Sequence, residues 1–207
     1  MSGSLVYVEY ISRRPGVSLE AFHSLAGHGQ TGWAGDNPEE VLLANLGRTW
    51  RTGPEPEYLA FWYTPGQGLD RFDDWERIFR SGEADEFEEP FKIAARIDRA
   101  GSYDPLIEPT PVATERVYIE FFDIAEGATH DDVTAAYEQR AGSHPELRLH
   151  FLLDRIGRLG PDPRGLAAWG LPSWAHLEEI ARDLDGVDAP VRLVNAGMYS
   201  EFGKETL

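Results

Sequence analysis

Two short stretches decide the fold: VYVEY at residues 6–10 and VYIEF at residues 117–121. Both are rich in β-branched and aromatic residues, which favour strands, and both place a glutamate at the fourth position. They stand near the start of each half of a 207-residue chain. A repeated first strand predicts that the chain contains two copies of one structural unit.

Further matches follow in the same order in both halves. Ser18 and Thr129 each precede a run with helical spacing and suit a helix N-cap. The remaining matched pairs are Leu46-Gly47-Arg48 with Ile156-Gly157-Arg158, Pro54-Glu55-Pro56 with Pro161-Asp162-Pro163, FDDWERIFR (72–80) with WAHLEEIAR (174–182), and Ala100-Gly101-Ser102-Tyr103 with Ala196-Gly197-Met198-Tyr199.

Each half therefore predicts strand, helix, strand, strand, helix, strand, which is the ferredoxin-like βαββαβ unit. We expect an α+β chain with repeat 1 at residues 1–105, a proline-rich linker at 106–114 and repeat 2 at 115–207. A sheet with helices on one face leaves its other face bare. Two such sheets can cover each other, so the prediction is an intramolecular dimeric α+β barrel with the helices outside.

This arrangement resembles the dimeric α+β barrel superfamily. Within it, LGRTWRTGPEPEYLAFWYTPGQGLDRFDDW at residues 46–75 is similar to the NIPSNAP-like and related small families. The resemblance implies a fold that hosts cofactor-free oxygenases, haem-degrading enzymes, haem-containing dehydratases, isomerases and polyketide cyclases. Such variety means that the fold alone does not predict the activity.

Composition excludes several classes of function. The chain has no cysteine, which removes disulfides, thiolate nucleophiles and iron–sulfur clusters. Its net charge of −17 disfavours a nucleic-acid partner. It shows no membrane-length apolar stretch and no leader pattern, so we expect a cytoplasmic protein with no membrane partner. A fused pair supplies its own second unit, so a monomer suffices for the barrel.

The two glutamates are the first catalytic candidates. In a strand, Tyr7 and Glu9 share one face, and Val6, Val8 and Tyr10 share the other. If the uniformly apolar face lies under the helices, Glu9 and Glu120 point into the barrel. Tyr7 and Tyr118 then face the same interior.

A buried carboxyl has a raised pKa and can serve as a general acid or base. The alternative is structural: Glu9 and Glu120 each bond a tyrosine hydroxyl or meet an arginine such as Arg48, Arg96, Arg158 or Arg192.

His150 and Asp154 in LHFLLDRIG share a strand face and form the second catalytic candidate, as a proton-transfer pair. They could equally be two metal ligands or two polar residues that are simply hydrogen-bonded. The other histidines show no HExxH-type spacing, so no metal site is predicted.

Aromatic residues supply the predicted ligand-binding walls. Trp33 and Trp50 occur only in the first half, and Tyr7 and Tyr118 occupy matching strands. His28 lies in GHGQTGWAGDN, which we expect to be a pocket-side loop without a phosphate-loop pattern. No cofactor is predicted, although one axial histidine such as His28 would be enough for haem.

These features predict a small-molecule protein with an apolar barrel pocket. The first hypothesis is an enzyme for an aromatic or polyketide-like compound: a cofactor-independent monooxygenase, a cyclase or an isomerase. The alternative is a non-catalytic, NIPSNAP-like ligand-binding or assembly module.

Overall fold

The fold was determined from a computed structural model, which describes residues 3–36, 38–114, 116–182 and 190–201. Within these ranges, the side chains of His28, Asp36, Ala181 and Arg182 are not described. Both halves follow the order strand, helix, strand, strand, helix, strand that the hydrophobic spacing predicts, with an additional helix before the last strand of the first half.

The described part of the first half contains four strands and three helices: β1 (Leu5–Arg13), α1 (Leu19–Asp36), β2 (Val41–Arg48), β3 (Tyr58–Thr64), α2 (Arg71–Ser81), α3 (Asp85–Ala94) and β4 (Ala95–Pro105). Gly82, with a φ of 80°, ends α2 in the left-handed conformation that glycine adopts readily. This turn lets α3 follow α2 directly.

The described part of the second half has the same strand pattern with shorter helices: β5 (Val117–Ile124), α4 (His130–Ser143), β6 (Arg148–Arg155), β7 (Gly165–Gly170), the 3₁₀ helix η1 (Trp174–His176), α5 (Leu177–Arg182) and β8 (Val191–Glu201). Thr129 caps α4 as expected, because its hydroxyl accepts a bond from the Asp132 N–H and Asp132 bonds back. Both halves place a cis X-Pro bond between their second and third strands, at Glu55-Pro56 and Asp162-Pro163.

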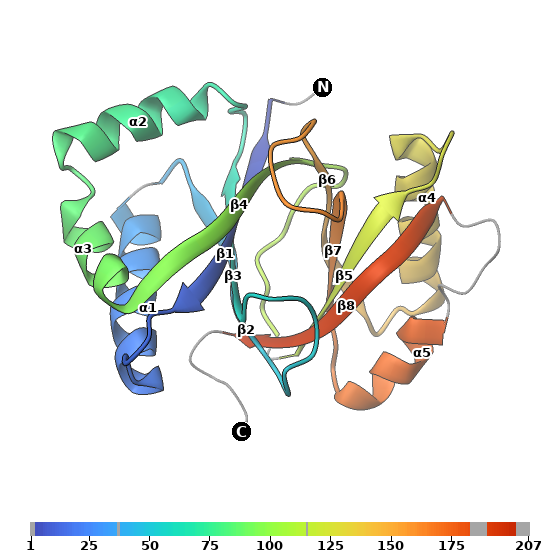
Figure 1. Cartoon of the computed structure of the whole chain (residues 1–207). Helices are drawn as coiled ribbons and strands as arrows, with labels where there is room; N and C mark the ends of the chain where they lie inside the picture. The colour runs from blue at the N-terminus through green and yellow to red at the C-terminus, as the bar shows by residue number, and fades with distance from the viewer. Residues whose placement is uncertain (1–2, 37, 115, 183–189, 202–207) are drawn as a thin grey trace.

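The eight strands close into one barrel with the order β1-β3-β2-β8-β5-β7-β6-β4. Antiparallel pairing of β2 with β8 joins the halves on one side, and pairing of β4 with β6 joins them on the other. Figure 1 shows the strands in the centre, with α1, α2 and α3 at one flank and α4 and α5 at the other. The α+β barrel predicted from the sequence is therefore present.

Apolar side chains from both halves pack the barrel interior. Val6, Val8 and Tyr10 of β1 lie in one buried cluster with Ile119 of β5. At its centre the rings of Phe61 and Phe151 lie 4.6 Å apart. The interior is therefore a shared hydrophobic core and not the ligand pocket that the sequence suggested.

The predicted orientation of β1 and β5 is wrong. Tyr7 packs in the cluster beneath α1, and Tyr118 in the cluster beneath α4. Glu9 and Glu120, which alternate with the interior residues, face the same helical side. The reason is that the helical side supplies the polar partners that a buried carboxyl needs, Gln30 of α1 for Glu9 and Arg140 of α4 for Glu120.

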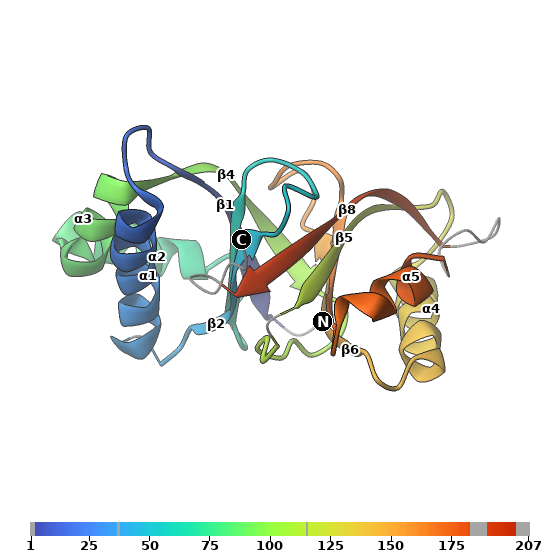
Figure 2. The same ribbon diagram turned by 90° about the horizontal axis from the view of Figure 1, so that it is seen from below.

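The first half, as described, has three helices on its side of the sheet. Figure 2 shows α1, α2 and α3 standing beside the sheet as one group, opposite α4 and α5. Gly29 and Gly32 allow α3 to approach α1, since a Cβ atom at either position would come within 3 Å of Phe87. Among the described residues, no helix is long and apolar enough to cross a membrane.

Candidate functional site

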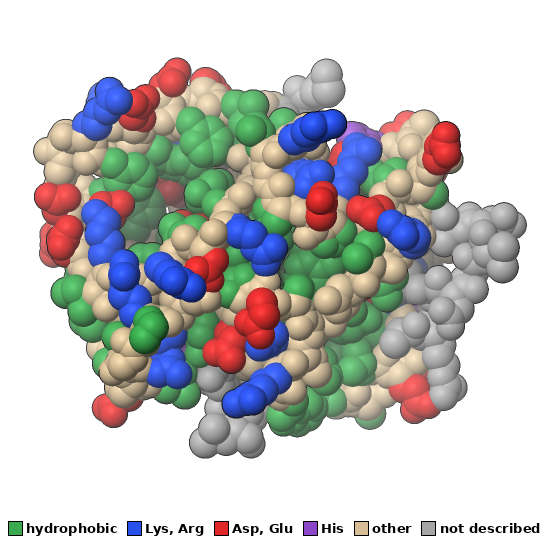
Figure 3. Space-filling model, in the orientation of Figure 1, with side chains coloured by type: hydrophobic (Ala, Val, Ile, Leu, Met, Phe, Trp, Pro, Cys, Tyr) green, Lys and Arg blue, Asp and Glu red, His purple; other side chains and the backbone are tan. Residues whose placement is uncertain are grey.

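A cavity of about 570 Å³ lies between the sheet and the helices of the first half. Aromatic side chains dominate its walls: Tyr7, Trp33, Trp62, Phe72, Trp75, Phe79, Phe87 and Phe91. Figure 3 shows hydrophobic side chains around a hollow in the region bounded by α2, α3 and β4. An apolar cavity of this size with a few polar groups is typical of small-molecule sites.

Glu9 of β1 is the carboxyl group on the sheet side of this cavity. One of its oxygens accepts hydrogen bonds from the Trp62 indole at 3.2 Å and from the Gln30 amide at 3.4 Å. Asn45 donates to the Gln30 oxygen at 2.6 Å, which turns the Gln30 NH₂ group toward Glu9. Among the described residues, the hydrogen bonds to Glu9 thus come from neutral donors.

Burial raises the pKa of Glu9 to about 7. The two hydrogen bonds oppose this rise, and the negative charge of Glu40 adds to it. A carboxyl with this pKa exchanges protons readily near neutral pH, as a general acid or base must.

Glu40, beside β2, is the second buried carboxyl of the cavity, and its environment differs. Arg71 donates to one oxygen at 2.7 Å, and the indoles of Trp33 and Trp75 donate to the carboxylate as well. The ion pair between Arg71 and Glu40 holds α2 against the start of β2. The two tryptophans that bond Glu40 line the cavity. Glu40 thus has a buried cationic partner in Arg71, while Glu9 lacks a described cationic partner.

Glu120 occupies the corresponding place in the second half and is fully buried. The Nη1 group of Arg140 donates to both of its oxygens, at 2.8 and 2.9 Å, and Trp169 donates at 3.1 Å. Burial raises the pKa of Glu120, and the Arg140 guanidinium opposes that rise. The structural alternative thus fits Glu120, with Arg140 in place of the arginines considered from the sequence.

The predicted wall residues divide into two groups. Tyr7 and Trp33 line the cavity, and the Trp33 ring stacks on Phe79 at 6.2 Å. Burial raises the pKa of Tyr7 to about 12, so its hydroxyl stays protonated. Tyr118 lies instead in the packed cluster beneath α4.

Trp50 lies away from the cavity, and the predicted ligand-binding role of His28 falls outside the described atoms. Trp50 is 59% exposed and packs against Trp174 of the other half, with ring centres 5.7 Å apart. It does not line the cavity. His28 belongs to α1 and not to a loop, and its side chain lies outside the described atoms.

His150 and Asp154 have separate partners. The His150 ring lies 3.3 Å from the Thr110 hydroxyl, and burial lowers its pKa to about 4. Asp154 accepts hydrogen bonds from Arg164 at 2.5 Å and contacts His130 at 2.6 Å. The structure does not pair the two residues, because positions four residues apart along a strand are separated by about 13 Å.

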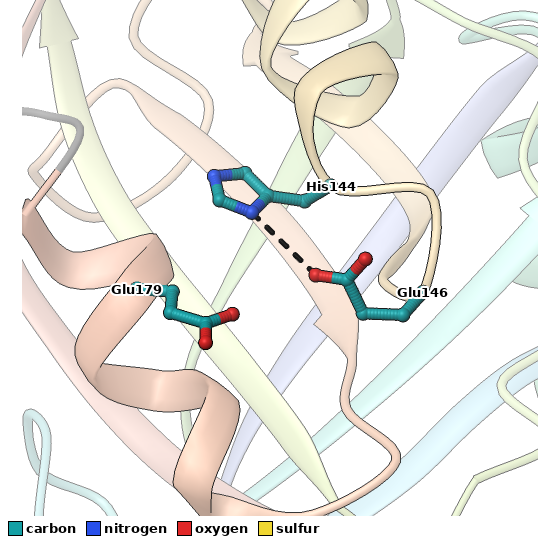
Figure 4. A group of neighbouring side chains, drawn as sticks. All are labelled: His144, Glu146 and Glu179. Atoms are coloured by element: carbon teal, nitrogen blue, oxygen red, sulfur yellow. Dashed lines mark ion pairs between the residues drawn. The ribbon is translucent and has the colours of Figure 1, made fainter.

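Three further side chains gather at the surface of the second half. His144 pairs with Glu146 at 3.5 Å, and Glu179 reaches toward them from α5 (Figure 4). Their ligand atoms lie within 4.8 Å of one another, and both glutamates are exposed. The cluster lies where the loop after α4 comes near α5.

Sequence reasoning missed Gln30, Glu40, Trp75 and Arg71, although they build the cavity around Glu9. Gln30 and Trp33 are one helical turn apart, a spacing that would have placed both on the inner face of α1. The glycines of GHGQTGWAGDN favour a loop in the sequence, and this conceals the helical pattern.

No family model and no curated protein matches the sequence. Solved structures do match over nearly the whole chain. A haem-binding protein from Thermus thermophilus has 12% identity and a TM-score of 0.62, covering 97% of this chain and 92% of that one. A mutant chlorite dismutase from Candidatus Nitrospira defluvii has 9% identity and a TM-score of 0.57, covering 98% and 93%. At such identities the likeness shows the fold alone.

The described cavity does not fit haem. Haem iron takes an axial His, Met, Cys or Tyr ligand. Tyr7 is the only one of these types among the residues that line the cavity, and its raised pKa disfavours the tyrosinate that iron would need. The corresponding space beneath α4 holds the packed rings of Tyr137 and Trp169.

Proposed function

Because the chain shares its fold with chlorite dismutase-like proteins of the dimeric α+β barrel superfamily, we propose that it binds an aromatic small molecule in the first-half cavity and that Glu9 exchanges a proton with it. One observation carries this proposal: the carboxyl with a pKa of about 7 lies in an aromatic cavity of about 570 Å³. The reaction class is proton transfer, as in an isomerase, a cyclase or a cofactor-independent oxygenase.

The residues around Glu9 have two roles in this proposal: some orient its carboxyl group, and others form the wall that the ligand contacts. Trp62 and Gln30 hold one oxygen of Glu9, which leaves the other oxygen to accept a proton from the ligand. Tyr7, Phe72 and Trp75 pack edge to face and form an apolar wall beside it. Removal of water by the bound ligand would strengthen the contact between the ligand and Glu9.

The cavity is tested first with N-phenyl-1-naphthylamine, a neutral aromatic probe whose fluorescence rises in apolar sites. We expect saturable binding that Tyr7→Leu weakens about tenfold, which corresponds to the loss of one ring contact of roughly 1.4 kcal/mol. Tyr118→Leu, at the matching strand position, is the control and should leave binding unchanged. No saturable binding, or equal losses in both variants, would contradict the proposal.

Proton transfer is tested with 2-indanone in D₂O, an aromatic ketone whose acidic C–H groups exchange visibly in ¹H NMR spectra. General base catalysis contributes about 10²–10⁴-fold in rate, so the protein should accelerate exchange above the buffer rate. Glu9→Gln should abolish that acceleration without abolishing probe binding.

The non-catalytic alternative is a NIPSNAP-like binding module with the same cavity. In it, Glu9 acts only as an acceptor for Trp62 and Gln30. Specific probe binding combined with 2-indanone exchange at the buffer rate would favour this second function.

A further inference from the structure

Glu9 and Glu120 hold the same position in their sheets. Each is flanked by alanine on both neighbouring strands: Ala60 and Ala100 beside Glu9, and Ala167 and Ala196 beside Glu120. Each also accepts a bond from a tryptophan indole two residues beyond the flanking alanine, at 3.2 Å from Trp62 and 3.1 Å from Trp169. The two halves thus present one carboxylate site twice.

In the second half a cation fills this site. The Arg140 guanidinium bonds Glu120 and lies over the Trp169 ring, 5.1 Å from its centre. Its second nitrogen bonds the Ile180 carbonyl. Carboxylate, aromatic face and carbonyl together define what this site accepts: a positively charged nitrogen group.

In the first half the corresponding residue is a glycine. Gly29 follows Glu9 by the same 20 residues as Arg140 follows Glu120, and α1 and α4 begin at equivalent positions. Gly29 carries no side chain that could reach Glu9, and both Glu9 and Trp62 line the cavity. The place that a guanidinium takes beside Glu120 is therefore open to a ligand beside Glu9.

The described cations around the cavity have partners of their own. Arg71 pairs with Glu40 at 2.7 Å, and Arg96 pairs with Asp98 at 2.6 Å. Lys92 forms an ion pair with Glu88 on the same helix, and Arg14 donates to a backbone carbonyl. Within the described residues, none of these four forms an ion pair with Glu9.

We propose that the first-half cavity selects an aromatic compound that carries a basic nitrogen, and that this nitrogen pairs with Glu9 over Trp62 as Arg140 pairs with Glu120 over Trp169. This inference rests on the proposed function and specifies its ligand class. The aromatic part of the ligand packs against the walls of the cavity. Its protonated amine, amidine or guanidine group provides the positive charge that Arg140 provides in the second half.

The experiment compares 2-naphthylmethylamine with 2-naphthylmethanol by isothermal titration calorimetry at pH 8.5. The two probes have nearly the same shape and differ in an ammonium against a hydroxyl group. The wild-type chain should bind the amine at least tenfold more tightly than the alcohol. Glu9→Gln should bind both equally, and Glu138→Gln, which removes an exposed charge from α4, should keep the preference.

The outcomes separate the two proposals. If the wild type binds both probes equally, or if Glu9→Gln keeps the preference for the amine, the inference is overturned while the proposed function stands. If neither probe binds to a chain whose folding is verified by circular dichroism, the proposed function fails and this inference fails with it.

Discussion

At the scale of single residues, the protein shows how one carboxylate position can serve two purposes. Glu120 is neutralised by Arg140 and connects β5 to α4. Glu9 is bonded by neutral groups, and its pKa lies near 7. The difference depends on one helical residue, since Gly29 stands where the second half has Arg140.

Glu9→Gln should change how stability depends on pH. The folded pKa of Glu9, about 7, exceeds its ordinary value of 4.5, so the folded state holds a proton that the unfolded state releases. The wild type therefore loses stability as pH rises from 4.5 to 7. After allowance for the partial exposure of Glu9, the loss amounts to about 2 kcal/mol.

Urea unfolding at pH 5 and pH 8 measures this effect. The stability of Glu9→Gln relative to the wild type should rise between the two pH values, and that of the control Glu138→Gln should not. An unchanged difference for Glu9→Gln would mean that Glu9 titrates normally.

Arg140→Met should lower the free energy of unfolding, because Glu120 depends on the Arg140 guanidinium. Removal of the guanidinium leaves Glu120 buried without a cation, which costs about 3–5 kcal/mol. The double variant Glu120→Gln/Arg140→Met should recover a large part of this loss, because neither partner is then charged. Urea unfolding at pH 7 compares the wild type, Arg140→Met and the double variant. If the double variant is as unstable as Arg140→Met, the unpaired charge of Glu120 is not the cause of the loss.

The sequence predicts the burial of Glu9 and Glu120 but not the direction in which they point. The pair of glutamates was visible as a repeated letter in VYVEY and VYIEF, and burial of both was expected. Their direction was not, because alternation separates two faces without saying which face the helices cover. The partners of Glu9 come from α1 and β3, and only the assembled fold brings them together.

At the scale of elements, the cavity exists because the first half has an additional helix. The α3 helix packs on α1 through Gly29 and Gly32 and forms the outer wall. The second half, as described, has α5 and packed rings in this region. The element order of both halves was predictable from hydrophobic spacing, but α3 was not, because Pro90 within it argues against a helix.

The alignment of the two halves of the sequence also fails to predict which residues of β2 and β6 are equivalent. The match of Leu46-Gly47-Arg48 with Ile156-Gly157-Arg158 places Arg158 opposite Arg48. In the structure Arg48 ends β2 and Arg155 ends β6, and each donates to a glycine carbonyl in the following loop. Short glycine-centred matches mislead because hairpin register depends on strand pairing and loop length.

Gly29→Ala tests the contact between α1 and α3. Its Cβ would lie 2.6 Å from the Phe87 carbonyl oxygen, so α3 must shift, at a cost of about 1–3 kcal/mol. Gly35→Ala in the same helix has no atom within 4 Å and should be neutral or gain up to about 1 kcal/mol. Thermal unfolding compares the two variants, and equal effects would show that α3 does not pack closely on α1.

At the scale of the whole molecule, the two halves form one hydrophobic unit. The β2–β8 and β4–β6 pairs close the barrel, and the interior takes side chains from both sheets. Closure of the barrel was predictable, because two sheets that each have a bare apolar face need cover. The location of the cavity outside the barrel was not, because it depends on how completely side chains fill each compartment.

Phe151→Ala should destabilise both halves together. It removes the ring that contacts Phe61 at the centre of the barrel, and such a cavity costs about 3–5 kcal/mol. Amide hydrogen exchange should accelerate in β1 as much as in β5, because the halves share one core. Acceleration restricted to the second half would show that the two halves unfold independently.

¹³C NMR titration of the glutamate carboxyl groups measures the pKa of Glu9 and its response to a ligand in one experiment. One resonance should have a midpoint near pH 7, be absent in Glu9→Gln, and shift when N-phenyl-1-naphthylamine occupies the cavity. A spectrum in which the Glu9 resonance titrates near its ordinary value of 4.5 and does not respond to the probe would contradict the proposed role of Glu9.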